Sequence, residues 1–195
     1  MAGRVAGKIK LQTVDELLGV PEIAGTQEIE LGRIHAFPNH PFKVLDDERM
    51  DMLVESIREN GILNPVIVRP DKNGDYEMIS GHRRLHAAGI VGLSKIPAIV
   101  KEMSDDEAII KMVDANIQRE EIMPSEKAFA YKMKLEAMKR TAGRPTKENA
   151  CHNGTHLRSD QELALQVGDS ARSIQRYIRL TELIPELLEC IDNKK

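Results

Sequence analysis

Hydrophobic and polar positions change their period along the chain, and this change predicts two structurally different parts. In the first part, short apolar or alternating runs bounded by turn residues predict strands. These runs are Glu28–Ile34, Pro65–Pro70, Tyr76–Ser80 and Ile96–Lys101. A helix is predicted over Asp46–Asn60, where apolar residues recur every three or four positions, and a second helix over Gly81–Ala88.

After these strands, every periodic segment has the helical spacing. Ser104 and Glu107 form a capping box that predicts the start of a helix, and Pro124 opens another that runs to about Lys139. The segment Thr141–Arg158 is rich in Gly, Thr, Asn and charged residues, which is typical of a linker, and helical periods return after it. We therefore predict a flexible arm over residues 1–27, an α/β domain over 28–121 and an all-α domain over 122–195.

Composition limits the function classes without choosing one. The chain has 195 residues, of which 41% are hydrophobic, 30% are charged and two are cysteines, and its net charge is −3. No apolar run reaches the roughly 18 residues of a membrane span, and two cysteines do not make a disulfide framework, so we expect a cytoplasmic protein with no membrane contact. The net charge excludes a uniformly basic protein, but nucleic-acid binding depends on local charge.

The first chemical candidate is the segment Ile79–Arg84, where a predicted strand becomes a helix. Free N–H groups at a helix start favour anions, Gly81 allows close approach, and Arg83 and Arg84 are forked donors for one phosphate group. The alternative is two solvated arginines at a helix end. His82 and His86 lie one helical turn apart, but with no third ligand evident we interpret them as a solvated face rather than a metal site.

A second polar group follows the helix that Ser104 opens. The side-chain oxygen of Asn116 can ligate a cation, and Arg119 can meet an anion. The alternative is an ordinary solvated helix end.

The third candidate is a helix-turn-helix at about residues 159–180. Ala164, Gly168, Ile174 and Tyr177 have its spacing of a small crossing residue, a turn glycine and two buried anchors. The opposite face carries donors suited to base edges and phosphates. These donors are Ser170, Arg172, Ser173, Gln175, Arg176 and Arg179. The alternative is a helical hairpin with a solvated basic face.

Taken together, three motifs resemble those of the ParB partition-protein family over about Glu28 to Asp192. They are Gly61–Arg69, Ile79–Ala88 and Asn116–Glu120, followed by the helix-turn-helix. The resemblance implies binding to a centromere-like DNA site, and binding of CTP with Mg²⁺ that closes a clamp on DNA. It assigns the CTP site to Gly81, His82, Arg83, Arg84, His86, Asn116 and Arg119, with Asn116 also holding Mg²⁺.

Departures from the family pattern limit the expected chemistry. The family has Glu where this chain has His82, Arg where it has His86, and Glu where it has Ala115. Because the missing glutamate is implicated in metal binding and turnover, we expect at most a slow CTP hydrolase. The fold is also similar to that of sulfiredoxin, but the loop lacks the reactive cysteine, so peroxiredoxin repair is not expected.

We therefore expect a sequence-specific DNA-binding protein of chromosome or plasmid partition, associated with the nucleoid. The expected partners are a palindromic double-stranded site, bound by a homodimer, and a ParA-type ATPase. Family members usually carry a further C-terminal dimerisation domain, so we expect a truncated chain that is largely monomeric without DNA. Two alternatives stay open: a nucleotide-using enzyme such as a kinase or nuclease, and a transcription regulator of a mobile element.

Overall fold

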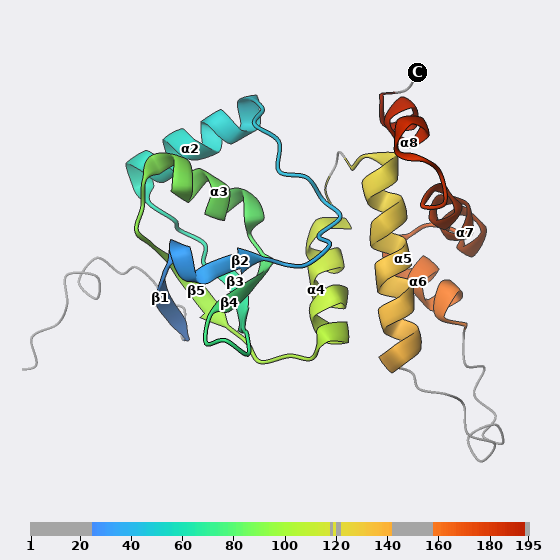
Figure 1. Ribbon diagram of the computed structural model, residues 1–195, viewed down its shortest axis with the longest axis horizontal. Helices are drawn as coiled ribbons and strands as arrows, with labels where there is room; N and C mark the ends of the chain where they lie inside the picture. The colour runs from blue at the N-terminus through green and yellow to red at the C-terminus, as the bar shows by residue number, and fades with distance from the viewer. Residues whose placement is uncertain (1–24, 118, 120–121, 142–157, 194–195) are drawn as a thin grey trace, which may run out of the picture.

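The protein is described here by a computed structural model, in which residues 25–117, 119, 122–141 and 158–193 are placed. An α/β half comes first and an all-helical half follows, as predicted (Figure 1). The first half contains β1 (Thr26–Glu30), the 3-10 turn η1 (Leu31–Arg33), β2 (Ile34–Ala36), α2 (Glu48–Asn60), β3 (Val66–Pro70), β4 (Tyr76–Ser80), α3 (His82–Val91), β5 (Lys95–Val100) and α4 (Asp105–Ile117). The second half contains α5 (Pro124–Thr141), α6 (Ser159–Val167), α7 (Ala171–Leu180) and α8 (Pro185–Asp192).

The five strands form one mixed sheet in the order β1-β5-β3-β4-β2. β3 and β4 form the predicted antiparallel hairpin, while β3 lies parallel to β5 and β2 lies parallel to β4. The single strand predicted over Glu28–Ile34 is wrong, because η1 divides it into β1 and β2, which lie at opposite edges of the sheet. The backbone N–H of Leu31 donates to the carbonyl of Ser94, in the register of the β1–β5 pair, and η1 begins at this residue.

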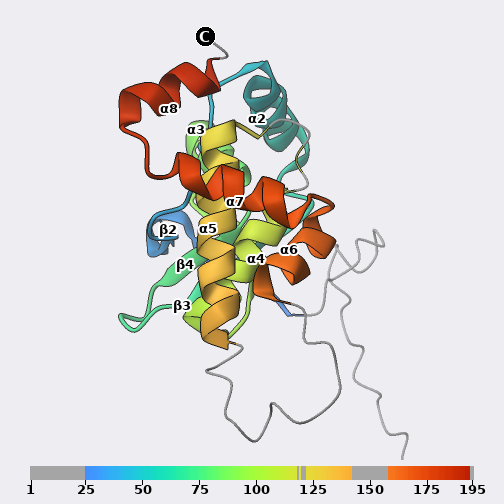
Figure 2. The same cartoon turned by 90° about the vertical axis from the view of Figure 1, so that its right-hand side faces the viewer.

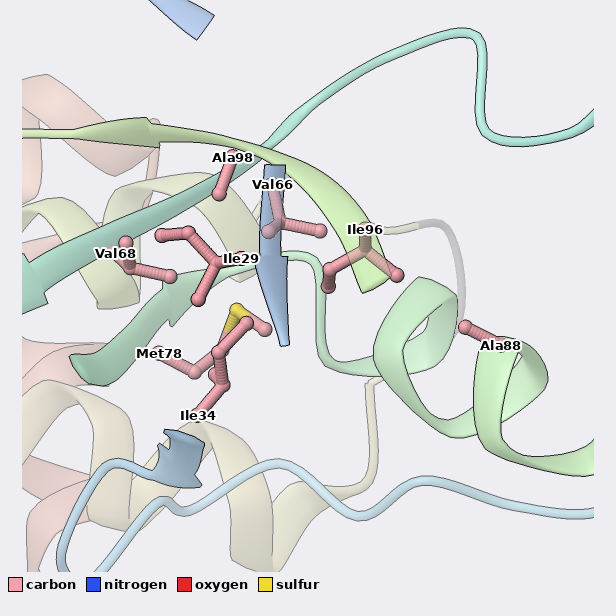
Figure 3. Packing of buried hydrophobic residues seen from close by; sticks show 8 residues of the cluster. All are labelled: Ile29, Ile34, Val66, Val68, Met78, Ala88, Ile96 and Ala98. Carbon is pink, nitrogen blue, oxygen red and sulfur yellow. The ribbon is translucent and has the colours of Figure 1, made fainter. Parts of the chain in front are cut away.

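The sheet is covered on both faces. Neighbouring residues of a strand point to opposite faces, so each strand contributes side chains to both layers of packing. Met78 belongs to the buried cluster shown in Figure 3, which also contains residues of the other strands and Ala88 of α3. The next residue, Ile79, packs on the other face against Met112 and Val113 of α4. The start of α3, where the anion loop was predicted, is therefore held between two buried clusters.

The helical half is built around α5, which contacts α4 on one side and α6, α7 and α8 on the other (Figure 1), and Figure 2 shows α7 crossing over α5. Between α4 and α5, the buried ammonium of Lys134 lies 2.5 Å from a carboxylate oxygen of Asp114. At the start of α5, the N–H and the hydroxyl of Ser125 both donate to Asp192 at the end of α8.

Several local predictions are confirmed by the structure. The N–H of Ser104 donates to Glu107 and the N–H of Glu107 donates back to the Ser104 hydroxyl, which is the predicted capping box. The predicted arm and linker fall mostly on residues 1–24 and 142–157, outside the described part of the chain. In the placed residues, no helix has the length and apolar character of a membrane span.

Candidate functional site

The predicted anion loop is a tight turn between β4 and α3, and Gly81 sits at its centre. Gly81 has φ +109°, a left-handed conformation that disfavours every residue with a Cβ. A Cβ atom at this position would lie 2.7 Å from Cγ1 of Val66 on β3. The turn therefore requires glycine, and it brings the first N–H groups of α3 to the surface of the sheet, where they lack intrahelical acceptors.

The two arginines of the loop point to different partners. Nη2 of Arg83 donates to the carboxylate of Asp47 at 2.8 Å, and Asp47 also caps α2 by accepting from the N–H of Met50. Nη1 of Arg84 donates to the backbone carbonyls of Asn64 and Pro65, and burial lowers the pKa of Arg84. The expectation that both guanidinium groups point to one anion is thus not met here, because Arg84 is anchored to the turn before β3.

Arg83 lines a cleft of about 600 Å³ that lies between the α/β half and the start of α5. A volume of this size is within the usual range for small-molecule sites. Its charged lining residues are the basic Lys43, Arg49, Arg83 and Arg119 and the acidic Asp47, Glu126 and Asp192. The cleft brings together Arg83 and Arg119, two residues that the family resemblance assigns to one site.

Arg119 lies beside the ring of Phe42, with its guanidinium carbon 5.7 Å from the ring centre. Burial lowers the pKa of Arg119, while the carboxylate of Glu126 opposes that effect. Glu126 in turn accepts from the backbone N–H of Lys43 at 2.7 Å. Asp47, Arg49 and Glu126 were not predicted as residues of this cleft. Charged residues are common near the start of a helix, and nothing in the local sequence indicates that these three share a site.

The interpretation of His82 as part of a solvated face is wrong. The His82 side chain is buried and its ring stacks on that of His40, with ring centres 3.8 Å apart. Only His86 matches the interpretation, because it is exposed and lies 2.8 Å from the carboxylate of Asp46. The difference arises because the first turn of α3 lies against the loop that carries His40, which is far away in sequence.

Asn116 is buried at the end of α4, and its side-chain nitrogen donates to the carbonyl of Met112 at 2.7 Å. The neighbouring Ala115 is exposed, and Asp114 is directed to Lys134. In the described ranges, no group of three or more acidic, histidine or cysteine side chains can hold a metal ion. The amide oxygen of Asn116 suits Mg²⁺, which usually takes few protein ligands and several phosphate or water oxygens. The segment Cys151–His156 lies outside the described residues.

The helix-turn-helix prediction is matched by α6 and α7. Gly168, with φ +76°, ends α6, and the hydroxyl of Ser170 caps α7 by accepting from the N–H of Ser173. Ile174 is fully buried, and the half-buried ring of Tyr177 lies edge-on to that of Tyr131. The predicted anchors therefore face α5.

The other face of α7 is exposed, and it carries most of the predicted base-reading residues. Arg172, Gln175, Arg176 and Arg179 are exposed there. Within the described residues, none of the three arginines takes part in an ion pair, so their guanidinium groups face solvent. Ser170 and Ser173 are engaged in the cap of α7.

The turn before α7 is tied to α5 by a carboxylate that the sequence analysis missed. Asp169 accepts from the hydroxyl of Tyr131 and lies 2.8 Å from the ammonium of Lys127. The hydrogen bond from Lys127, followed by that from Tyr131, lowers the pKa of Asp169. Burial, assisted by Asp169, raises the pKa of Tyr131, so its hydroxyl stays a donor. These contacts fix the orientation of α7.

Known proteins match both halves of this arrangement. The ParB N-terminal domain family matches residues 15–117 of the chain. The chromosome-partitioning protein Spo0J of Thermus thermophilus is 35% identical over 169 residues, which are 87% of this chain and 55% of that protein. The nucleoid occlusion protein of Listeria monocytogenes is 31% identical over 196 residues, which are 98% of this chain and 61% of that protein. The chain thus spans a little over half the length of these curated relatives.

A solved structure supports the same fold. The C-terminally truncated chromosome-partitioning protein ParB of Caulobacter crescentus, complexed to the centromeric parS site, matches with a TM-score of 0.53 and 23% identity. The match covers 85% of this chain and 76% of that one. At this identity the match shows a shared fold.

Proposed function

Because the chain belongs to the ParB N-terminal domain family, we propose that it binds a palindromic DNA site through α7 and CTP with Mg²⁺ in the cleft beside α3. Two copies occupy the two halves of the site, since two-fold sites match two-fold proteins. The process served is partition of a chromosome or plasmid on the nucleoid, together with a ParA-type ATPase. The relatives named for chromosome partitioning and nucleoid occlusion support this class of function.

The exposed face of α7 is the observation that carries the proposal. Arg172, Arg176 and Arg179 concentrate positive charge on one helix of a chain whose net charge is −3. Arginine can bind guanine through two hydrogen bonds and glutamine can bind adenine, so Gln175 adds to the set of base-reading groups. Ile174 and Asp169 hold this face outward from α5.

A site-selection experiment tests the DNA-binding function. The chain is used to enrich sites from random duplexes, and affinity for the best site is compared with affinity for random DNA. Arg176→Ala is expected to lose about 1–3 kcal/mol of affinity and to relax specificity at one base position. The control is Arg58→Ala, which removes an exposed arginine of α2 paired only with Glu55. Equal affinity of the wild type for selected and random DNA would refute the function.

The nucleotide proposal is supported by the basic lining of the cleft. Arg83 and Arg119 flank it, and the first turn of α3 adds N–H donors and the positive end of the helix dipole. Arg83→Ala is expected to lose about 1.5–3 kcal/mol of CTP affinity, since a charge-assisted contact disappears. Arg33→Ala, which removes an arginine at the far edge of the sheet beside Asp75, is the matched control.

Turnover is proposed to be slow or absent. Asn116 would hold Mg²⁺, which when bound polarises the phosphoryl oxygens, but Ala115 offers no carboxylate to assist. Because Ala115 is exposed, a glutamate fits there without repacking the core. Ala115→Glu is therefore expected to raise phosphate release from CTP while leaving CTP affinity similar.

A genome-wide pull-down of bound DNA separates partition from the other candidate functions. A few sharp sites with spreading flanks support partition, whereas many promoters support the regulator of a mobile element. Hydrolysis of ATP or DNA that is unaffected by Arg176→Ala supports an enzyme.

A further inference from the structure

A pair of stacked histidines lies beneath the nucleotide loop. His40 comes from the loop between β2 and α2, and His82 is the first residue of α3. Their ring centres are 3.8 Å apart with the planes 37° from parallel, and His82 is only 8% exposed. Nε2 of His40 and both ring nitrogens of His82 are buried without a hydrogen-bond partner, and they are the only such side-chain atoms in the described part of the chain.

A buried polar group without a hydrogen-bond partner destabilises the folded state, and native structures rarely contain such groups. Each such group destabilises the fold relative to a satisfied group, so three unpartnered atoms in one place call for an explanation. An apolar residue at position 40 or 82 would avoid that cost. The pair sits where α3 begins, beside Arg119, which indicates that a ligand supplies the missing partner.

The hydrogen bond of His40 decides which form of its ring can meet an anion. Nδ1 of His40 lies 2.7 Å from the carbonyl oxygen of Phe42, and a carbonyl only accepts, so Nδ1 carries the hydrogen. A neutral ring then has a bare lone pair at Nε2, which repels an anion. Only a protonated His40 can donate from Nε2 to a phosphate oxygen.

The charges around the pair keep it neutral while the cleft is empty. Burial is the largest cause that lowers the pKa of both rings, and together with the charges of His40 and Arg119 it brings that of His82 to about 3. Arg119 lowers the pKa of both rings, the nearby His40 lowers that of His82, and Glu126 of α5 raises that of His40. On α3, Arg83 adds to the positive field at Arg119.

We propose that the His40–His82 pair takes up a proton when a polyphosphate binds between Arg83 and Arg119, and that the protonated pair donates to it. This inference rests on the proposed nucleotide site. A bound polyphosphate carries several negative charges, so it opposes the lowering of the pKa of the pair by Arg119.

The direction of the resulting pH dependence follows from linkage. The pKa of the pair is higher with the anion bound than without it, so affinity is greatest below the ligand-free pKa, falls as pH rises from that value to the bound-state pKa, and is constant above it. One coupled proton changes affinity by up to about tenfold per pH unit.

Titration calorimetry of the whole chain with CTP and MgCl₂ measures the proton directly. Runs at pH 6.5 in two non-phosphate buffers of different ionisation enthalpy give the number of protons taken up. The terminal phosphate of CTP also ionises near pH 6, but it contributes equally in every variant. His82→Phe keeps the ring and its stack, and His40→Asn keeps an amide donor for the Phe42 carbonyl. Both are expected to lose the proton uptake and most of the pH dependence.

The control is His35→Gln, which removes an exposed histidine at the edge strand β2, 4.0 Å from Asp71. It is expected to keep the wild-type proton uptake, and melting temperatures verify that each variant is folded. Binding of CTP with the same proton number in the wild type and in His40→Asn would overturn the coupling while leaving the nucleotide site intact. No binding of CTP, ATP, GTP or inorganic triphosphate between pH 6 and 8 would overturn both.

Discussion

Replacing Gly81 by alanine tests whether the loop before α3 depends on close contact with the sheet. Gly81 has φ +109° and ψ 22°, and its new Cβ would lie 2.7 Å from Cγ1 and 3.1 Å from Cβ of Val66. Val66 is fully buried on β3, so it has no free space into which it can move. Both the backbone and the packing therefore oppose the substitution.

The expected loss of stability is the sum of two separate effects. A left-handed backbone costs an L-residue about 1–2 kcal/mol. Forcing a methyl group into a packed core typically costs a further 1–3 kcal/mol or so. We therefore expect Gly81→Ala to lower the free energy of unfolding by about 2–5 kcal/mol.

Gly92 provides a matched control at the other end of the same helix. It has φ +83°, but a Cβ there would meet no atom within 4 Å. Gly92→Ala should thus show only the backbone cost of about 1–2 kcal/mol. Urea unfolding followed by circular dichroism at 222 nm measures both variants, and the difference between them isolates the clash.

A double-mutant cycle with Val66→Ala tests the source of the clash. Val66→Ala creates a cavity and is destabilising alone, but it removes Cγ1, the atom closest to the new methyl group, and keeps Cβ. The double variant should therefore be less destabilised than the sum of the two single variants, by about 1 kcal/mol or more. If Gly81→Ala is no more destabilising than Gly92→Ala, or if the cycle shows no coupling, the described geometry of the loop is wrong.

Three further predictions concern the helical half. Ile174→Ala should destabilise the chain by about 2–5 kcal/mol in urea unfolding, since Ile174 is fully buried. Asp114→Ala should cost on the order of 3 kcal/mol by leaving the Lys134 ammonium buried and unpaired, whereas Lys134→Met, which removes the charge, should cost less. The pKa of Asp169 is lowered in the folded state, so its stabilising effect is present above the ordinary carboxyl value near 3.8 and is lost as pH falls through the folded value. The melting temperature of Asp169→Asn should accordingly approach that of the wild type on acidification below about pH 4; a constant gap would contradict this assignment.

Local sequence patterns were enough to predict most of the elements. The apolar spacing of Asp46–Asn60 predicted α2, and the Ser104–Glu107 box predicted the start of α4. Gly168 predicted the turn between α6 and α7. Each of these signals acts within one or two turns of chain, where capping and periodicity have direct physical causes.

Sequence patterns alone thus predict the order of elements, the glycine turn before α3 and the donors along α7. What surrounds these features depends on long-range packing: His82 stacks on His40, Arg83 contacts Asp47 while Arg84 contacts the turn before β3, and β1 and β2 separate. The physical reason is range. A cap or an apolar stripe depends on residues a few positions away. Burial and the electric field at a charged group depend instead on segments that the core brings together. His40 and His82 are about 40 residues apart in the sequence, and Arg83 and Asp47 are more than 30 apart.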